Sequence, residues 1–450
     1  MWKLMVAWIG ILLSSSGYAE GKVLNWQKDI DFYAEKMVSN HIDPFHTLSK
    51  AGFYAEIRRI KESLRNKSKS EILIDLMRLT RGINDGHTSL PLWGEEQARF
   101  PIELKLFDNS LRVVSTVAQY KEILGAKLIS VNDMPASKVF MLVSGVSPFS
   151  ENEYSIAVRA ASYLPDAIIL KGLGILKSED EAKFSFDVQG QKRDFIFKSS
   201  TSLELNARIS HFNDEIFSAA EKISNDLWYG SSSDKKTVYI KFRRYTTVPK
   251  MENFAQHILG FINENKSERL IIDLRDNYGG DFFVGLKLAQ FLLLADSINW
   301  KSGVYTLIDN VTFSAAMSNA AQFSQILNSK LVGEPTGAKP SGYQDMGQFS
   351  LPNSGLVVTF SKRLYHFKED QRDALYPDEH IEVSIEDYLN GYDRQLRWVL
   401  THINSTNEVI TSTSNCTLAY APFWGGYATL PQNSASAKVQ LTWALCAPRN

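Results

Sequence analysis

The sequence has little cysteine and no excess of charge of either sign. Only 2 of its 450 residues are cysteine, Cys416 and Cys446, and both lie near the C-terminus. So few thiolates exclude a zinc ribbon, an iron–sulfur cluster held by cysteines and a disulfide-rich scaffold. Lys and Arg number 49 against 50 Asp and Glu, a formal charge of −1, so the chain lacks the basic footprint of a nucleic-acid or membrane-surface protein. Its 44% hydrophobic content excludes wholesale disorder.

Long apolar runs are also missing, except at the N-terminus. Lys3 is the only charge in the first nineteen residues, an apolar run spans residues 4–13, and small residues stand three and one positions before Glu20. This layout predicts a secretory signal peptide over residues 1–19, and a buried N-terminal helix is the alternative. The run is too short for a stable membrane anchor. We therefore expect a soluble protein that is exported to the periplasm or secreted, with no stable membrane span.

The periodicity of apolar residues divides the rest of the chain into four predicted parts. Residues 20–95 carry helical stripes and predict a helical N-terminal domain. Residues 96–230 contain alternating runs with hairpin turns and predict an antiparallel β-rich module with one or two helices. Residues 231–408 alternate strands with helices, which predicts an α/β core with a largely parallel sheet and one closing helix over residues 386–400. Residues 409–450 form a charge-poor tail with no clear period.

Two strand-to-helix turns in the predicted core have residues suited to acyl chemistry. A buried strand ends in a turn over residues 273–280 that closes with Gly279 and Gly280, whose backbone N–H groups can approach an oxyanion closely. A second strand is followed by Ser314, at the start of a helix, where the helix dipole stabilises a developing negative charge and the N–H of Ala315 points to the same space. The alternatives are a ligand-free turn and an ordinary helix N-cap.

Two further residues are candidate general bases for such a serine. His87 lies in a turn of sequence Asp-Gly-His-Thr, and histidine is the side chain best suited to proton transfer near neutral pH. Lys339 lies in a glycine-containing loop after the serine-bearing helix, and a partly buried lysine can act as a base. A satisfied polar histidine and a solvated loop lysine are the alternatives.

Taken in order, these segments resemble the S41 peptidase family, which includes the C-terminal-processing and tricorn-core proteases. The resemblance covers roughly residues 25–402 and is most specific from Asp273 to Leu396; residues 125–140 are similar to the last part of a PDZ-like module. The motifs that carry it are Asp-Gly-His-Thr at 85–88, Asp-Leu-Arg-x-Asn-x-Gly-Gly at 273–280, Phe-Ser-Ala-Ala at 313–316, Leu-Val-Gly-Glu-x-Thr-Gly at 331–337, Leu-Pro-Asn-Ser-Gly-Leu at 351–356 and Tyr-Pro-Asp at 376–378.

The resemblance implies a fold and a set of roles. The fold is a crotonase-like α/β core preceded by a helical segment and a PDZ-like β-rich module. Ser314 falls on the nucleophile, and its base is His87, as in the tricorn-like branch, or Lys339, as in the processing proteases. The remaining roles are an oxyanion hole from Gly279, Gly280 and Ala315, and an acid among Glu369, Asp370 and Asp373, of which Asp373 is preferred.

The sequence therefore predicts an exported serine endopeptidase that acts on polypeptides through an acyl-enzyme, with no metal or cofactor. A non-catalytic member of the same fold that binds a peptide or an apolar ligand is one alternative, and an esterase is another. Export would permit a disulfide between Cys416 and Cys446. Deleting residues 409–450 should leave activity intact if the tail is an appended segment.

Overall fold

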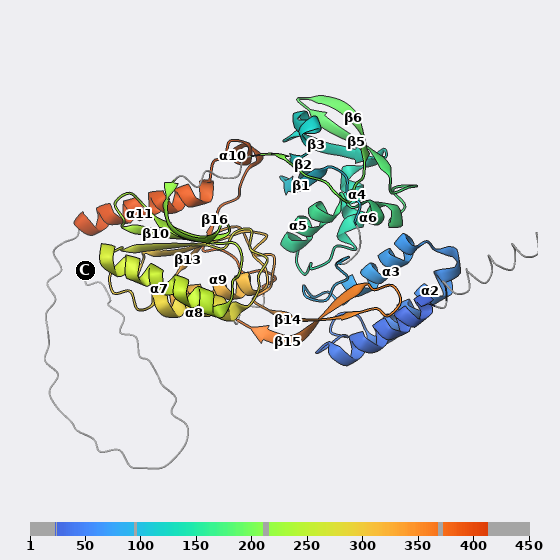
Figure 1. Cartoon of the computed structure of the whole chain (residues 1–450), viewed down its shortest axis with the longest axis horizontal. Coiled ribbons are helices and arrows are strands. Elements are labelled where there is room, and N and C mark those ends of the chain that lie inside the picture. Colours follow the sequence, from blue (N-terminus) through green and yellow to red (C-terminus); the bar gives the residue numbers. More distant parts are fainter. Residues whose placement is uncertain (1–22, 24, 94–96, 210–215, 368–371, 413–450) are drawn as a thin grey trace, which may run out of the picture. The chain divides into compact units, whose positions relative to one another are not determined.

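The computed structural model describes residue 23 and residues 25–93, 97–209, 216–367 and 372–412 (Figure 1). The chain divides into two compact units, residues 1–403 and residues 404–450. Every element below belongs to the first unit, except the end of the last helix. The predicted signal peptide, both cysteines and most of the predicted tail lie outside the described residues, as do Glu369 and Asp370.

The predicted N-terminal helices are confirmed, and local sequence explains where they begin. A helix spans residues 25–40, followed by α2 (Lys50–Ser63) and α3 (Lys69–Arg81). The Ser49 side chain accepts the N–H of Gly52 at the start of α2. Ser68 and Glu71 form a reciprocal capping box at the start of α3, which satisfies backbone donors that a helix N-terminus leaves unpaired.

The following segment forms a seven-stranded antiparallel sheet with strand order β1-β2-β3-β5-β6, in which β4 pairs with β3 and β7 with β2. The predicted hairpin across Asp108 and Asn109 is present, and both residues take the positive φ that such a tight turn requires. Three α-helices accompany the sheet rather than the expected one or two. The elements are β1 (Ile102–Phe107), β2 (Ser110–Thr116), a 3₁₀ segment (Ala118–Ile123), β3 (Lys127–Val131), β4 (Met134–Pro135), α4 (Ala136–Ser144), α5 (Glu153–Tyr163), α6 (Ala167–Gly172), β5 (Glu181–Val188), β6 (Gln191–Lys198) and β7 (Ala207–Arg208).

The second sheet has seven strands in the order β16-β13-β12-β11-β10-β9-β8. Strands β10 to β13 and β16 are parallel, as predicted, whereas β8 and β9 add an antiparallel edge that the periodicity did not indicate. The bounds are β8 (Ser218–Ser224), β9 (Leu227–Ser231), β10 (Thr237–Phe242), α7 (Val248–Asn265), β11 (Arg269–Asp273), α8 (Phe282–Leu292), β12 (Val304–Ile308), α9 (Ala315–Ile326), β13 (Lys330–Gly333) and β16 (Glu379–His380).

Helices cover both faces of this parallel sheet, as the βαβ pattern requires. Apolar residues of α7, α8 and α9 share one core with one face of the sheet, and α11 (Arg394–Ser412) packs on the other through Leu396, Val399 and Ile403 (Figure 1). The predicted single closing helix is wrong. It is two helices, α10 (Ile385–Leu389) and α11, because Gly391 takes a φ of 62° between them.

A long hairpin, β14 (Ser341–Ser350) and β15 (Val357–His366), leaves the α/β core and joins the N-terminal part of the chain. Val358 and Phe360 of β15 belong to the same hydrophobic core as the N-terminal helices and the antiparallel sheet. Backbone bridges also join Ser89 to Thr359. The hairpin therefore holds the segment around residue 87 against the part of the chain that bears residue 314.

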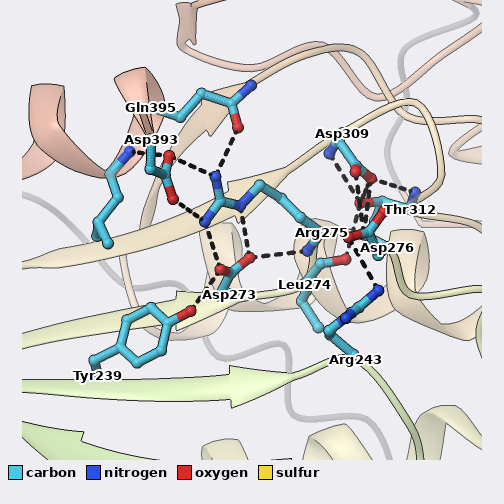
Figure 2. Close-up of polar contacts among 11 residues, drawn as sticks. Tyr239, Arg243, Asp273, Leu274, Arg275, Asp276, Asp309, Thr312, Asp393 and Gln395 are labelled. Atoms are coloured by element: carbon cyan, nitrogen blue, oxygen red, sulfur yellow. Dashed lines mark hydrogen bonds and ion pairs between the residues drawn. The ribbon is translucent and has the colours of Figure 1, made fainter. Parts of the chain in front are cut away.

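A buried arginine fixes the end of β11 (Figure 2). The guanidinium of Arg275 donates to both carboxylate oxygens of Asp273 and of Asp393, at 2.6 to 2.9 Å, and to the side-chain oxygen of Gln395 at 3.1 Å. The Tyr239 hydroxyl donates to Asp273 at 2.7 Å. This network ties α11 to the strand that leads into the turn at residues 276–280.

The mixed α/β fold with several sheets is thus as predicted. Among the described residues, no helix is both long and apolar enough to cross a membrane.

Candidate active site

The structure brings together His87 and Ser314, which are 227 positions apart in the sequence. His87 Nε2 lies 2.8 Å from Ser314 Oγ. The imidazole stacks on the ring of Phe313, with ring centroids 5.3 Å apart. A serine hydroxyl hydrogen-bonded to a buried imidazole is the arrangement that generates a nucleophile.

Ser314 is not an ordinary helix N-cap. Its side chain makes no capping hydrogen bond, and its backbone has φ 51° and ψ −126°, outside the regions that non-glycine residues favour. Such a conformation costs about 1 to 3 kcal/mol and persists where the surroundings impose it, often at functional sites. A strained strand-to-helix turn of this kind can hold a nucleophile exposed above a sheet.

Two backbone N–H groups beside Ser314 have no hydrogen-bond acceptor among the described residues, those of Gly280 and Ala315. The N–H of Gly279, by contrast, donates to the Asn277 side chain at 2.9 Å. Gly279 has a φ of 97°, and a Cβ there would lie 2.7 Å from the Ser314 Cβ. Only glycine fits at this close approach. Of the three predicted oxyanion residues, Gly280 and Ala315 offer donors, and Gly279 provides the space.

Burial lowers the pKa of His87, and the nearby guanidinium of Arg159 lowers it further. Asp85, the backbone of Tyr343 and Asp345 act in the opposite direction. The second ring nitrogen, Nδ1, is buried and makes no well-formed hydrogen bond with any described residue. The ring is therefore held in its neutral form, which can accept a proton.

A second histidine holds the turn that carries His87. Nδ1 of His41 accepts the backbone N–H of Asp43, so its Nε2 bears the proton and donates to Asp85 at 2.8 Å. Asp85 also accepts the hydroxyl of Ser361 and the backbone N–H of His87. Burial opposes ionisation of Asp85, but these hydrogen bonds outweigh it and hold the pKa of Asp85 below its usual range. The sequence singled out the Asp85 motif but gave no signal for His41.

Lys339 and Asp373 make other contacts. The backbone N–H of Lys339 donates to Glu151 at 2.8 Å, and no hydrogen bond or ion pair joins its ammonium group to a described residue. The carboxylate of Asp373 accepts the Tyr376 hydroxyl at 3.0 Å, and its carbonyl accepts the Asn152 amide. No hydrogen bond joins either residue to the Ser314–His87 pair. The structure therefore does not place the preferred acid, Asp373, in hydrogen-bond contact with the His87 ring.

Glu151 is a buried carboxylate that the sequence did not single out. It links the loop that carries His87 to the loop that carries Lys339. Its oxygens accept the backbone N–H groups of Gly86 at 3.2 Å and Lys339 at 2.8 Å. Its side chain lies so close to Gly86 that a Cβ there would be 2.9 Å away. Burial raises the pKa of Glu151 to about 7. Nothing in the sequence around Glu151 distinguishes it from a surface glutamate.

Glu151 should make the stability of the protein depend on pH. The folded state raises its pKa from 4.5 to about 7, so in that interval the folded protein holds a proton that the unfolded chain releases. The contribution of Glu151 to the free energy of unfolding is therefore fully present below about pH 4.5 and is lost as the pH rises through about 7. We expect Tm to fall more steeply between about pH 5 and about pH 8 in the native protein than in Glu151→Gln, which cannot titrate. Equal slopes in thermal unfolding curves would contradict this.

A cavity of about 920 Å³ opens beside the glycine pair. It lies between β1 and α5 on one side and the turn that bears Tyr278, Gly279 and Gly280 on the other. Its lining includes Lys105, Asp276 and Tyr388. The volume is that of a typical ligand site. The described residues contain no cluster of metal-ligating side chains.

Comparison with known proteins gives a likeness of structure only. No family model and no curated protein sequence matches the chain. A crystal structure of a CPAF point mutant aligns with a TM-score of 0.62 at 13% identity, over 88% of this chain and 100% of the other. Mature CPAF aligns with a TM-score of 0.59 at 13% identity, over the same shares. Mature CPAF complexed with lactacystin aligns at 0.57 and 12% identity, over 87% and 99%.

The likeness extends over nearly the whole of both chains. The fold is that of an S41-like peptidase, which confirms the resemblance drawn from the motifs.

Proposed function

We propose that this chain is an exported serine endopeptidase that hydrolyses polypeptides through an acyl-enzyme on Ser314. The observation that carries the proposal is the 2.8 Å contact between His87 Nε2 and the hydroxyl of Ser314, which sits in a strained turn beside two unpaired N–H groups. The proposal includes the predicted signal peptide. It also includes the interpretation of residues 96–230 as a PDZ-like module and of residues 231–408 as a crotonase-like core.

The reaction follows from the positions of these groups. Ser314 Oγ attacks the carbonyl carbon of the scissile bond while His87 Nε2 takes the hydroxyl proton. The N–H groups of Gly280 and Ala315 donate to the oxyanion, an interaction worth about 3 kcal/mol per donor in known cases. Protonated His87 then gives its proton to the leaving amine. Water, deprotonated by His87, cleaves the acyl-enzyme and restores the serine.

The charges around His87 assist the protonated intermediate. Asp85 and Asp345 both favour the imidazolium, although neither hydrogen-bonds to the ring. They would stabilise it over a distance rather than orient it. The orientation comes from the Phe313 ring beneath it and from the backbone held by Asp85 and Glu151.

Active-site labelling tests this function. The purified protein should hydrolyse unfolded casein and should form a covalent adduct with a fluorophosphonate at Ser314, identified by mass spectrometry of the labelled peptide. Ser314→Ala is the matched control and should do neither. An esterase would cleave small esters but no polypeptide, and a non-catalytic binding protein would take no label. Either result would overturn the proposal.

A further inference from the structure

Arg159 is the unusual charged residue beside the Ser314–His87 pair. It lies on α5 and is partly buried. Its guanidinium carbon lies 4.2 Å from the ring centroid of Tyr278, 5.5 Å from that of Phe313 and 5.6 Å from that of Phe149. Phe313 precedes Ser314 in the sequence, and Tyr278 precedes Gly279. The cation therefore lies one side chain away from both the nucleophile and the oxyanion turn.

No carboxylate in the described part of the chain pairs with this guanidinium. Burial lowers the pKa of Arg159, and the only ionisable groups that favour its charged form are the phenols of Tyr278 and Tyr163. Phenols are neutral at pH 7. The cation is thus stabilised by aromatic faces alone.

Three other arginines, one of them buried and two partly exposed, pair with carboxylates instead. Arg275 lies between two carboxylates. Arg99 pairs with Asp166 at 3.0 Å, and Arg243 with Asp276 at 3.1 Å. A partly desolvated arginine without a counter-charge is costly, and a bound anion would offset that cost.

The aromatic setting leaves the polar edge of Arg159 available. Aromatic faces hold a guanidinium in place but accept few of its five N–H donors. Tyr278, which stacks on it, is 50% exposed and lines the cavity beside the glycine pair. A planar guanidinium in this state matches the two oxygens of a carboxylate.

We infer that Arg159 is a specificity-determining residue that binds a carboxylate of the substrate next to the scissile bond. The carboxylate is either an Asp or Glu side chain or the C-terminal carboxylate of the polypeptide. This inference rests on the proposed peptidase function and names its substrate class.

Paired peptides test the inference and distinguish the two sources. A cleavage site mapped in casein supplies the parent peptide. One series places Asp or Glu against Asn or Gln at each position flanking the scissile bond, and a second compares a free C-terminus with its amide. The native protein should favour the carboxylate by about 10- to 100-fold in kcat/KM in one series, mainly through KM. The series that responds identifies the source.

Three variants complete the test. Arg159→Met keeps the aliphatic packing and should reduce the acid-to-amide ratio to within about threefold, while it still cleaves the neutral peptides. Arg159→Lys should restore part of the ratio because it restores the charge. Arg58→Met, at an exposed position of α2, should leave the ratio unchanged. A native protein that does not discriminate, or an Arg159→Met protein that still does, would overturn the inference.

Measurements of peptide binding test this inference independently of the proposed function. Ser314→Ala should bind a fluorescent carboxylate peptide more tightly than its amide, and Ser314→Ala/Arg159→Met should bind both equally. This difference in affinity can be measured even if the native protein hydrolyses no peptide. Such a lack of hydrolysis would refute the proposed peptidase function, and the binding result would still test the carboxylate site. Equal affinities of the two peptides for Ser314→Ala would refute the carboxylate site.

Discussion

Replacing His87 with glutamine is expected to lower kcat on a polypeptide substrate by about four orders of magnitude with little change in KM. The imidazole is the only proton acceptor within 3 Å of the Ser314 hydroxyl among the described residues, at 2.8 Å. Glutamine fills similar space and can hydrogen-bond to the serine, but it cannot take its proton. Losses of this size are typical when a base that acts with a serine is removed. Steady-state kinetics with casein-derived peptides would measure it.

Lys339→Met is the matched comparison, since the motifs left both residues open as the base. The Lys339 backbone N–H, which contacts Glu151, is kept in this variant. We expect kcat within about threefold of the native value, and a loss comparable to that of His87→Gln would contradict the choice of His87.

The pH profile gives an independent measurement of the same assignment. A histidine acts as a base only when it is neutral, so kcat/KM should rise with pH through the pKa of His87 in the free enzyme. Burial and Arg159 lower this pKa below its usual value near 6.5, against the opposing effects of Asp85, Tyr343 and Asp345. The acid limb should therefore lie below pH 6.5, and a limb well above pH 7 would point to the lysine instead.

Replacing Arg275 with methionine is expected to destabilise the fold by about 3 to 5 kcal/mol. The variant leaves the carboxylates of Asp273 and Asp393 buried without their shared cation, and the cost of an unpaired buried charge is of this size. Both carboxylates are less than a tenth exposed. Urea unfolding followed by circular dichroism would measure the loss as a fall in the midpoint.

The loss should become smaller in acid, because a protonated Asp273 needs no counter-charge. Arg394→Met is a suitable control, since Arg394 pairs with Asp387 at 2.7 Å while half exposed to water. A pair whose arginine is open to water contributes less to stability than a cation buried between two carboxylates. A similar shift in both variants, or no shift for Arg275→Met, would show that the buried network does not hold α11 to the sheet.

The sequence predicted most of the elements because their signals are local. The buried run at residues 270–274 became β11, and the strand–helix alternation gave the parallel sheet. β8 and β14 were missed because they are rich in polar residues and show no clean alternation, and β9 because its run is only five residues long. Their pairing depends on neighbours far along the chain, which a local pattern does not report.

The candidate site divides in the same way. The motifs identified Ser314, His87 and the glycine pair, because glycine at a tight turn and a serine at a helix start are local features. They could not choose between His87 and Lys339, and they favoured Asp373, which the fold places beside Tyr376. They also gave no sign of His41, Glu151 or Arg159, whose side chains look ordinary until their neighbours are known.

The sequence by itself determined the class of fold, the candidate nucleophile Ser314 and the glycines that lie against it. Only the tertiary structure favoured His87 over Lys339 as the candidate base, because that choice depends on a distance between residues 227 positions apart. It also decided which charges are paired. Two carboxylates surround Arg275, whereas Arg159 contacts aromatic rings, and the sequence next to each arginine does not reveal these partners. The pairing and the burial of charged side chains arise when distant segments pack together, so the local sequence does not reveal them.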